Sequence, residues 1–116
     1  MKEVNKNIAK NIKNYMEALD ITQVELARRL NCANTSVSMW TQGEATPRMD
    51  KIDKMCEIFH CTRQDLISEN PKSRIEIEKD RTRAMFIEKY DQMSDELKLR
   101  LITYMDWLTK LGEDDQ

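Results

Sequence analysis

The sequence predicts an all-α protein, and three observations lead to that fold class. The 116 residues include only two Gly and two Pro, and β-branched runs are few, which favours helices over strands. Apolar residues recur at steps of three and four, the spacing that places side chains on one helical face. Beyond Pro71 the pattern changes. We therefore expect a five-helix domain at residues 1–70, then a connector and a two-helix segment at residues 71–116.

Composition and charge limit the classes of function. No stretch reaches the ~18 apolar residues of a membrane span, and the N-terminal MKEVNKNIAK lacks a signal-peptide core. We expect a soluble, cytoplasmic protein with no membrane association. The net charge is −2; residues 1–70 carry ten basic and ten acidic side chains, and residues 71–116 carry nine and eleven. Nucleic-acid-binding domains are usually basic, so this balance argues against tight nonspecific binding more than against specific binding.

The three cysteines, Cys32, Cys56 and Cys61, form no C-x-x-C pair. With His60 as the single histidine, Cys56 and Cys61 lack the further ligands of a zinc site. We interpret the cysteines as small buried apolar side chains in a reducing compartment, and we expect no metal and no cofactor. No Ser-Lys, Ser-His-Asp or Cys-His-Asn set is apparent, so we expect no enzyme activity.

The first predicted helix runs from about Val4 to Leu19. Its outer face carries Lys6, Lys10, Lys13 and several Asn. A solvated face is the preferred interpretation of these lysines, and phosphate contact is the alternative. The inward stripe, spaced by threes and fours, consists of Val4, Ile8, Ile12, Tyr15, Met16 and Leu19.

Residues 22–43, TQVELARRLNCANTSVSMWTQG, predict two short helices with a tight corner between them. Thr22 is suited to cap the first helix, and Glu25 completes a capping box. Asn31 tolerates the left-handed backbone conformation that a sharp corner needs. The inward face of this first helix is formed by Val24, Ala27 and Leu30.

In the second of these helices Val37 and Trp40 are expected to point inward, with Trp40 anchoring the helix in the core. The outward residues are Asn34, Thr35, Ser38 and Met39. Two short helices at a steep angle form a helix-turn-helix, and the second helix of such a motif fits the major groove of DNA.

Two further helices complete the predicted domain. Gly43 suits the end of the preceding helix, and Pro47 suits the start of the next, with Thr46 as its cap. Thr62 and Asp65 then start a short fifth helix. The inward residues of these two helices are Met49, Ile52, Met55, Cys56, Phe59, Leu66 and Ile67.

Residues 8–67 resemble the lambda-repressor-like (Cro-type, XRE) helix-turn-helix family. The resemblance rests on TQVELA at 22–27, TSVSMWTQG at 35–43, the segment from Pro47 to Ile58, and CTRQDLI at 61–67. It implies a five-helix domain that binds double-stranded DNA. The family's turn glycine is Asn31 here, and the usual Ser or Thr cap of the recognition helix is Ala33, so that helix either begins without a cap or is capped late by Asn34.

The resemblance also implies roles for individual residues. Bases would be read by Asn34, Thr35, Ser38 and Met39, and phosphates would be met by Gln23, Ser36, Gln42 and Arg48. Asn pairs with adenine, Ser and Thr bond several base edges, and Met packs on a thymine methyl group. None of these residues is an Arg that reads guanine, so we expect half-sites that contain A·T pairs.

The C-terminal segment begins with alternating charges at residues 72–83, which indicate a flexible connector or an exposed helix start. Ser94, followed by Asp95 and Glu96, indicates a second helix that begins after a hinge near Met93. An apolar stripe follows at helical spacing: Phe86, Tyr90, Met93, Leu97, Leu101, Tyr104, Leu108 and Leu111, widened by Ile87, Ile102 and Met105. So wide a stripe must be covered.

We expect this segment to form a homodimer, chiefly through Phe86, Tyr90, Leu97, Leu101, Tyr104, Met105 and Leu108. The alternative is that it folds back on the first domain. The expected function is a transcriptional regulator, a repressor of phage or prophage type that binds a palindromic operator as a dimer. The other hypothesis is an antitoxin or interaction regulator whose C-terminal helices bind another protein.

Overall fold

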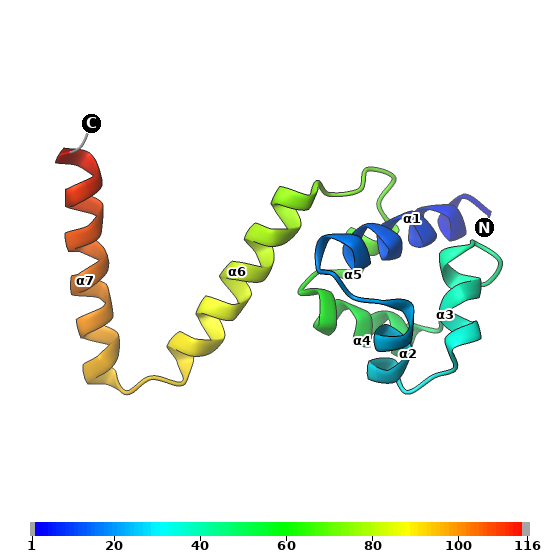
Figure 1. Cartoon of the computed structure of the whole chain (residues 1–116), viewed down its shortest axis with the longest axis horizontal. Helices are drawn as coiled ribbons and strands as arrows, with labels where there is room; N and C mark the ends of the chain where they lie inside the picture. Colours follow the sequence, from blue (N-terminus) through cyan, green and yellow to red (C-terminus); the bar gives the residue numbers. More distant parts are fainter. Residues whose placement is uncertain (1, 115–116) are drawn as a thin grey trace. The chain divides into compact units, whose positions relative to one another are not determined.

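The computed structural model describes residues 2–114, with side chains described for residues 5–113 (Figure 1). This part of the chain is all-helical, as the sequence predicts, and contains no strand. The helices are α1 (Lys2–Ala18), α2 (Gln23–Leu30), α3 (Asn34–Thr41), α4 (Met49–Phe59), α5 (Arg63–Ile67), α6 (Arg74–Asp91) and α7 (Asp95–Asp114). No helix in it is long and apolar enough to cross a membrane.

The chain divides into two compact units, the first ending at Thr82 and the second starting at Arg83. The first unit therefore extends past the boundary expected at residues 70–71. Ile77, in the first turns of α6, is fully buried in the core of this unit. Lys72 reinforces the junction, because its Nζ lies 2.7 Å from a carboxylate oxygen of Asp80 and 3.4 Å from one of Asp65. Of the two interpretations of residues 72–83, the helix start is the one observed.

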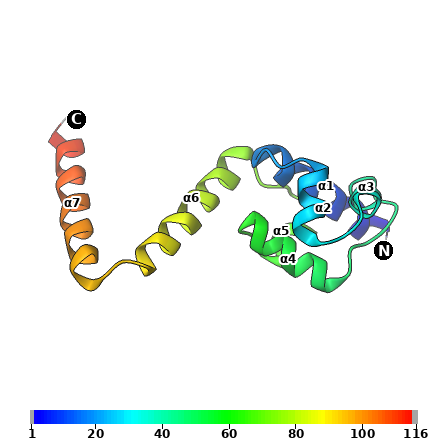
Figure 2. The same cartoon turned by 60° about the horizontal axis from the view of Figure 1, so that its bottom comes forward.

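The core of the first unit lies between α1 and the four short helices that follow it. α1 packs against α3 and α5, and α2 packs against α3 and α4 (Figures 1 and 2). The rings of Tyr15 and Phe59 stack with centroids 5.2 Å apart. The buried side chains include Ile8, Ile12, Tyr15, Leu26, Ala27, Leu30, Val37, Trp40, Ile52, Met55, Phe59 and Leu66.

Two residues expected in the core are exposed. Val24 is 65% exposed and Met49 is 52% exposed. In α2 the buried residues are Leu26, Ala27 and Leu30, so the inward face is turned away from Val24. Met49 is the first residue of α4, and the buried residues of this helix begin at Ile52. Val4 lies outside the residues whose side chains are described.

Asn11 is the opposite case, because the sequence predicted an asparagine-bearing outer face and this side chain is buried. Its Nδ2 donates to the carbonyl oxygens of Leu66 at 2.7 Å and Ser68 at 2.9 Å. These carbonyls end α5, where no helical N–H is available to them. One amide group therefore satisfies the end of α5 and fastens it to the middle of α1.

Helix ends follow the sequence signals in part. Thr22 Oγ1 accepts the Glu25 backbone N–H at 3.1 Å, as expected, whereas the Glu25 carboxylate binds arginines. The Thr62–Asp65 capping box is complete. The cap predicted at Thr46 is wrong: α4 begins two residues after Pro47, with Arg48 at the cap position and no side-chain bond.

Three non-glycine residues with left-handed backbones follow helices: Asp20 (φ 56°), Asn31 (φ 54°) and His60 (φ 57°). L-residues pay a steric cost in this conformation, which glycine avoids. The cost is offset by hydrogen bonds that close the helix ends, such as the Cys61 N–H to the Cys56 carbonyl at 3.0 Å.

The second unit contains the end of α6 and the whole of α7. The two helices are separated near Met93, as predicted, and Ser94 Oγ caps α7 by accepting the Leu97 N–H at 3.3 Å. The Lys98 ammonium lies 5.1 Å from the centroid of the Tyr90 ring, a cation–π contact between the two helices.

Candidate nucleic-acid interface

The corner between α2 and α3 is made by Asn31. Its left-handed backbone lets the chain reverse, and the next N–H, of Cys32, donates to the Ala27 carbonyl at 3.0 Å. α2 and α3 pack directly against each other, as both views show (Figures 1 and 2). The sequence prediction of two short helices joined by a tight corner is therefore confirmed.

One face of α3 is buried in the core, and the opposite face is exposed. Val37 is fully buried and Trp40 is 7% exposed, so the tryptophan anchors the helix, as expected. Asn34 and Thr35 are exposed, and Met39 is 43% exposed. Ser38 is half-buried. Three of the four predicted base-reading side chains are thus freely accessible on one short helix.

The first residue of α3 is Asn34, and Ala33 occupies the cap position without a side-chain hydrogen bond. The uncapped start is therefore the alternative observed. Asn34 is bonded to the preceding helix instead: Gln23 Nε2 donates to Asn34 Oδ1 at 3.0 Å and to the Asn34 carbonyl oxygen at 3.2 Å. The sequence analysis assigned these two residues separate roles and missed this bond, which only the packing of α2 on α3 creates.

The end of α3 is closed by a glycine turn. Gly43 adopts φ 76°, its N–H donates to the Trp40 carbonyl at 3.2 Å, and the Glu44 N–H donates to the Met39 carbonyl at 2.9 Å. Gln42 Nε2 donates to Ser38 Oγ at 3.1 Å. The structure thus pairs a predicted phosphate contact, Gln42, with a predicted base contact, Ser38.

The remaining two predicted phosphate contacts lie apart from these pairs. Ser36 is half-buried in the first turn of α3, and Arg48 is exposed at the start of α4. Among the described residues, no hydrogen bond or ion pair joins the Arg48 side chain to the other predicted site residues.

Charge around the motif is strongly paired. The Glu25 carboxylate lies 2.5 Å from Arg28 Nη2 and 2.9 Å from Arg29 Nε, and these hydrogen bonds lower the pKa of Glu25. Lys51 Nζ donates to the Leu30 carbonyl at 2.7 Å, which holds α4 against the end of α2. Glu25 thus offsets one of the two arginine charges, and both guanidinium groups remain exposed to solvent.

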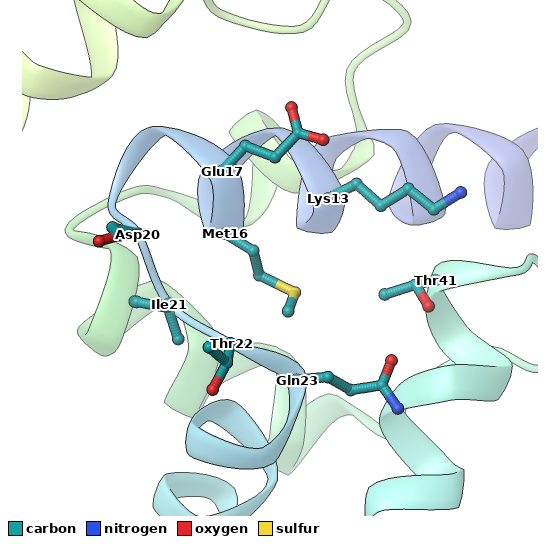
Figure 3. A pocket seen from close by; sticks show the side chains of 8 residues that line it. All are labelled: Lys13, Met16, Glu17, Asp20, Ile21, Thr22, Gln23 and Thr41. Carbon is teal, nitrogen blue, oxygen red and sulfur yellow. The ribbon is translucent and has the colours of Figure 1, made fainter.

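A hollow of about 370 Å³ lies beside the start of α2 (Figure 3). Its polar lining includes Lys13, Gln23 and Thr41, and the Met16 side chain points into its middle (Figure 3). Lys13 comes from α1, so three helices meet here. The sequence analysis preferred a solvated face for this lysine, with phosphate contact as the alternative, and the structure adds that Lys13 and Gln23 line the same hollow.

The cysteines are half-buried and free of disulfides. Burial raises the pKa of both the Cys56 and Cys61 thiols. A thiol whose pKa is raised is a poor nucleophile and a poor metal ligand. Among residues 2–114, no group of three His, Cys, Asp or Glu side chains is arranged to hold a metal ion.

The second unit presents apolar side chains rather than polar ones. Phe86, Leu97, Tyr104, Met105 and Leu108 of the predicted dimer surface are exposed by 42–55%, and Tyr90 and Leu101 are half-buried. The sequence analysis did not include Met85, Leu99 or Trp107, which are also exposed. Trp107 stacks with Tyr104 at 5.8 Å between ring centroids.

A short helix, a left-handed corner and an exposed second helix on a five-helix core define a helix-turn-helix DNA-binding domain. The comparison with protein families agrees: residues 11–72 match the Cro/C1-type HTH DNA-binding domain, and the chain belongs to this family. The resemblance inferred from the sequence motifs is confirmed.

Two known proteins are similar to this chain. Antitoxin PezA of Streptococcus pneumoniae serotype 4 is 32% identical over 63 residues, which cover 54% of this chain and 40% of PezA. The chain thus matches less than half the length of that relative. A transcriptional regulator from Listeria innocua shares the fold at a TM-score of 0.50 and 16% identity, covering 90% of this chain and 94% of its own.

Proposed function

We propose that this protein is a sequence-specific transcriptional regulator, a repressor of phage or prophage type, that binds a palindromic operator as a homodimer. The observation that carries the proposal is the outer face of α3, where Asn34, Thr35 and Met39 are accessible while Val37 and Trp40 hold the helix in place. An anchored helix with short polar and thioether side chains suits base-edge contact in the major groove.

In this proposal Asn34 reads adenine, Thr35 bonds a neighbouring base edge, and Met39 packs on a thymine methyl group. Gln23 supports the reading, because its amide already holds Asn34 Oδ1. Ser38 has a smaller part, since it is half-buried and accepts a hydrogen bond from Gln42. The half-site is therefore expected to contain A·T pairs.

Phosphate contacts fix the position of α3 on the duplex. We assign them to Gln23 and Ser36 on one side of the reading face and to Gln42 and Arg48 on the other. Arg48 is exposed and is the charged member of this set. It is therefore expected to contribute most to the salt dependence of binding.

Homodimerisation is assigned to the second unit. Apart from Leu99, ten large apolar side chains between residues 85 and 111 are exposed by 40–55%. At roughly 150–250 Å² for a full large side chain, their exposed area is on the order of 1,000 Å². A standard interface buries about 800 Å² on each partner, so one further copy is sufficient to cover this surface. A dimer also matches the symmetry of a palindromic operator.

A second candidate function is that of an antitoxin, in which the C-terminal helices bind a different protein. The similarity of 63 residues of this chain to antitoxin PezA favours it. The two candidates share the DNA-binding domain and differ in what covers α7. The partner of the second unit is therefore the property that separates them.

In vitro selection of bound duplexes from a random pool tests the main proposal. We expect a recovered sequence with two A·T-containing half-sites in inverted orientation, about one helical turn apart from centre to centre. Recovery of single half-sites without symmetry would exclude the palindromic operator. A pool that yields no enriched sequence would exclude sequence-specific binding.

A further inference from the structure

We propose that Cys56 and Cys61 form a dithiol site at the end of α4, which a small-molecule disulfide oxidises to an intramolecular disulfide. The inference goes beyond the interpretation of these cysteines as apolar side chains, and it does not depend on the proposed function. Disulfides inside cells are usually transient and redox-sensing. The dithiol is therefore the resting form, and the disulfide forms when small oxidised disulfides accumulate.

The first argument is the way in which α4 ends. His60 has a left-handed backbone (φ 57°), and the Cys61 N–H donates to the Cys56 carbonyl at 3.0 Å. A helix end closed by this bond brings together two residues that are five positions apart, and their side chains commonly touch. A disulfide requires α-carbons roughly 4.4–6.8 Å apart, and a helix end closed in this way meets that requirement.

The same backbone closure occurs at two other helix ends and provides a comparison within the chain. After α1, the Ile21 N–H donates to the Met16 carbonyl at 2.8 Å, so the facing side chains are both apolar. After α2, the Cys32 N–H donates to the Ala27 carbonyl at 3.0 Å. Cys32 therefore has the same backbone setting as Cys61, but it faces a methyl group instead of a second thiol.

The second argument is the influence of the two thiols on each other. Both side chains are half-buried and pack against the core. Burial is the main cause of the raised pKa of Cys61, and the Cys56 thiol is the next cause. Burial also raises the pKa of Cys56, and Cys61 is the next group that acts on it. Each thiol therefore lies within interaction distance of the other.

The third argument is the hydroxyl group of Tyr15. This side chain is 2% exposed, and its hydroxyl has no hydrogen-bond partner among the described residues. The hydroxyl adjoins Cys61 and acts to lower the pKa of that thiol, against the larger effect of burial. Buried polar groups without a partner are rare in folded proteins. A Cys61 thiolate would give the hydroxyl an acceptor, so Tyr15 is placed to stabilise that thiolate while it reacts.

The oxidation is a pair of thiol–disulfide exchanges. The Cys56 sulfur attacks one sulfur of the reagent disulfide, whose S–S bond breaks and releases one reagent thiol. The Cys61 sulfur then attacks the Cys56 sulfur and releases the second reagent thiol. The two leaving thiolates take up the two protons of the cysteines, and two electrons pass to the reagent. Raised thiol pKa values make the first step slow, whereas the second step is intramolecular and favoured by proximity.

The test treats the folded full chain with oxidised glutathione and then identifies tryptic peptides by mass spectrometry. Trypsin cleaves after Lys54 and Arg63, so Cys56 and Cys61 fall in one peptide and Cys32 falls in another. We expect the peptide of residues 55–63 to lose two hydrogen atoms, and the Cys32 peptide to show no such loss. A 55–63 peptide that stays reduced, or that only retains glutathione, would overturn the proposal.

A second measurement separates the effect of the fold from mere closeness in the sequence. The effective concentration of the dithiol is measured against the glutathione couple, in buffer and in concentrated urea. It should be roughly tenfold or more higher in the folded chain, because a disulfide that fits the fold stabilises it. The Tm of the oxidised protein should rise accordingly. An effective concentration no higher in buffer than in urea would contradict the site.

Three variants assign the roles of the individual residues. Cys32→Ser should form the disulfide as the wild type does, and Cys61→Ser should stop at a glutathione adduct on Cys56. Tyr15→Phe keeps a ring to stack on Phe59 but lacks the hydroxyl, so it should form the disulfide more slowly, through a longer-lived adduct. Loss of the disulfide in Cys32→Ser would overturn the site. The wild-type rate in Tyr15→Phe would overturn the role of Tyr15.

Discussion

Gln23 at the start of α2 donates hydrogen bonds to both the side-chain and the main-chain oxygen of Asn34 at the start of α3. The two residues stand on opposite sides of the corner that defines the motif. Oδ1 of Asn34 accepts a hydrogen bond from Gln23, whereas its Nδ2 group has no acceptor among the described hydrogen bonds. The orientation of a side chain proposed to read a base thus depends on a residue of the other helix.

Removing that support should change sequence preference. In Gln23→Ala the Asn34 amide loses its partner, so discrimination at the base pair it reads should fall by up to about 1–3 kcal/mol. Selection from a random pool would show the relaxed position. Gln64→Ala, an exposed glutamine of α5, is the control and should leave the selected sequence unchanged. Loss of affinity with no change in preference would contradict the supporting role of Gln23.

Substitutions should distinguish the residues proposed to contact bases from the residue proposed to contact phosphate. Thr35→Ala and Met39→Ala should each alter which half-sites are selected, because both side chains are proposed to touch base edges. Arg48→Ala should weaken binding to all sequences and lower the salt slope by about one. Competitive binding to a panel of half-site variants measures both effects. If Arg48→Ala alters sequence preference, the division between the two kinds of contact is wrong.

Charged side chains placed in the apolar surface of α7 should dissociate the proposed homodimer. Leu101→Asp combined with Leu108→Asp buries two carboxylates in the proposed interface and should give a monomer in analytical ultracentrifugation. Leu99→Asp is the matched control, because this exposed leucine lies off the stripe of Leu97, Leu101, Tyr104 and Leu108. A monomeric wild type at micromolar concentration would contradict the homodimer, and a dimer that survives the double change would contradict its location.

The buried amide of Asn11 should be important for stability. Asn11→Ala leaves the Leu66 and Ser68 carbonyls without their donor, which should lower the free energy of unfolding by about 1–3 kcal/mol. Urea denaturation followed by circular dichroism measures the change. Asn7→Ala, on the same helix and half-buried, should stay within about 0.5 kcal/mol of wild type. Equal stability of the two variants would show that the α5 carbonyls find another partner.

Left-handed positions offer a paired test of backbone strain. His60→Gly should stabilise the domain by about 1 kcal/mol, because glycine adopts φ 57° without the steric cost borne by an L-residue. Gly43→Ala should destabilise the domain by a similar amount, because alanine bears the steric cost of φ 76°. A Cβ at this position would meet no atom within 4 Å, so the effect would not arise from a packing clash. Thermal unfolding of both variants measures the two effects. Shifts of the same sign would mean that strain is not the controlling factor.

Much of the fold could be predicted from the sequence because local signals agree with the packing. Asn31 permits the corner, Thr62 with Asp65 starts α5, and the positions of Val37 and Trp40 give the inner side of α3. The two wrong core assignments have different causes. In α2, with eight residues, three apolar side chains did not define the inner face, and Val24 is exposed. Met49 is exposed because it is the first residue of α4, one turn before the buried Ile52.

The sequence predicted which residues belong to the candidate site, but it did not predict the hydrogen bonds between them. Family motifs indicate which positions of α3 face outward, but a hydrogen bond such as Gln23–Asn34 depends on the angle between two helices. The same holds for Asn11, whose partners are 55 and 57 residues away. Lys13 lies ten positions before Gln23 and shares a hollow with it only because α1 and α2 meet there.

The pairing of Glu25 with Arg28 and Arg29 has a consequence for the time that the protein spends on DNA. The single Glu25 carboxylate offsets one of the two arginine charges, so this part of the motif attracts phosphates of arbitrary sequence less strongly than two unpaired arginines would. Nonspecific complexes depend on such charges, so we expect them to be short-lived at physiological salt. The lifetime of a complex would then depend on the contacts of α3 with the bases. The protein would dissociate quickly from most DNA sequences and stay bound at the few sites that match.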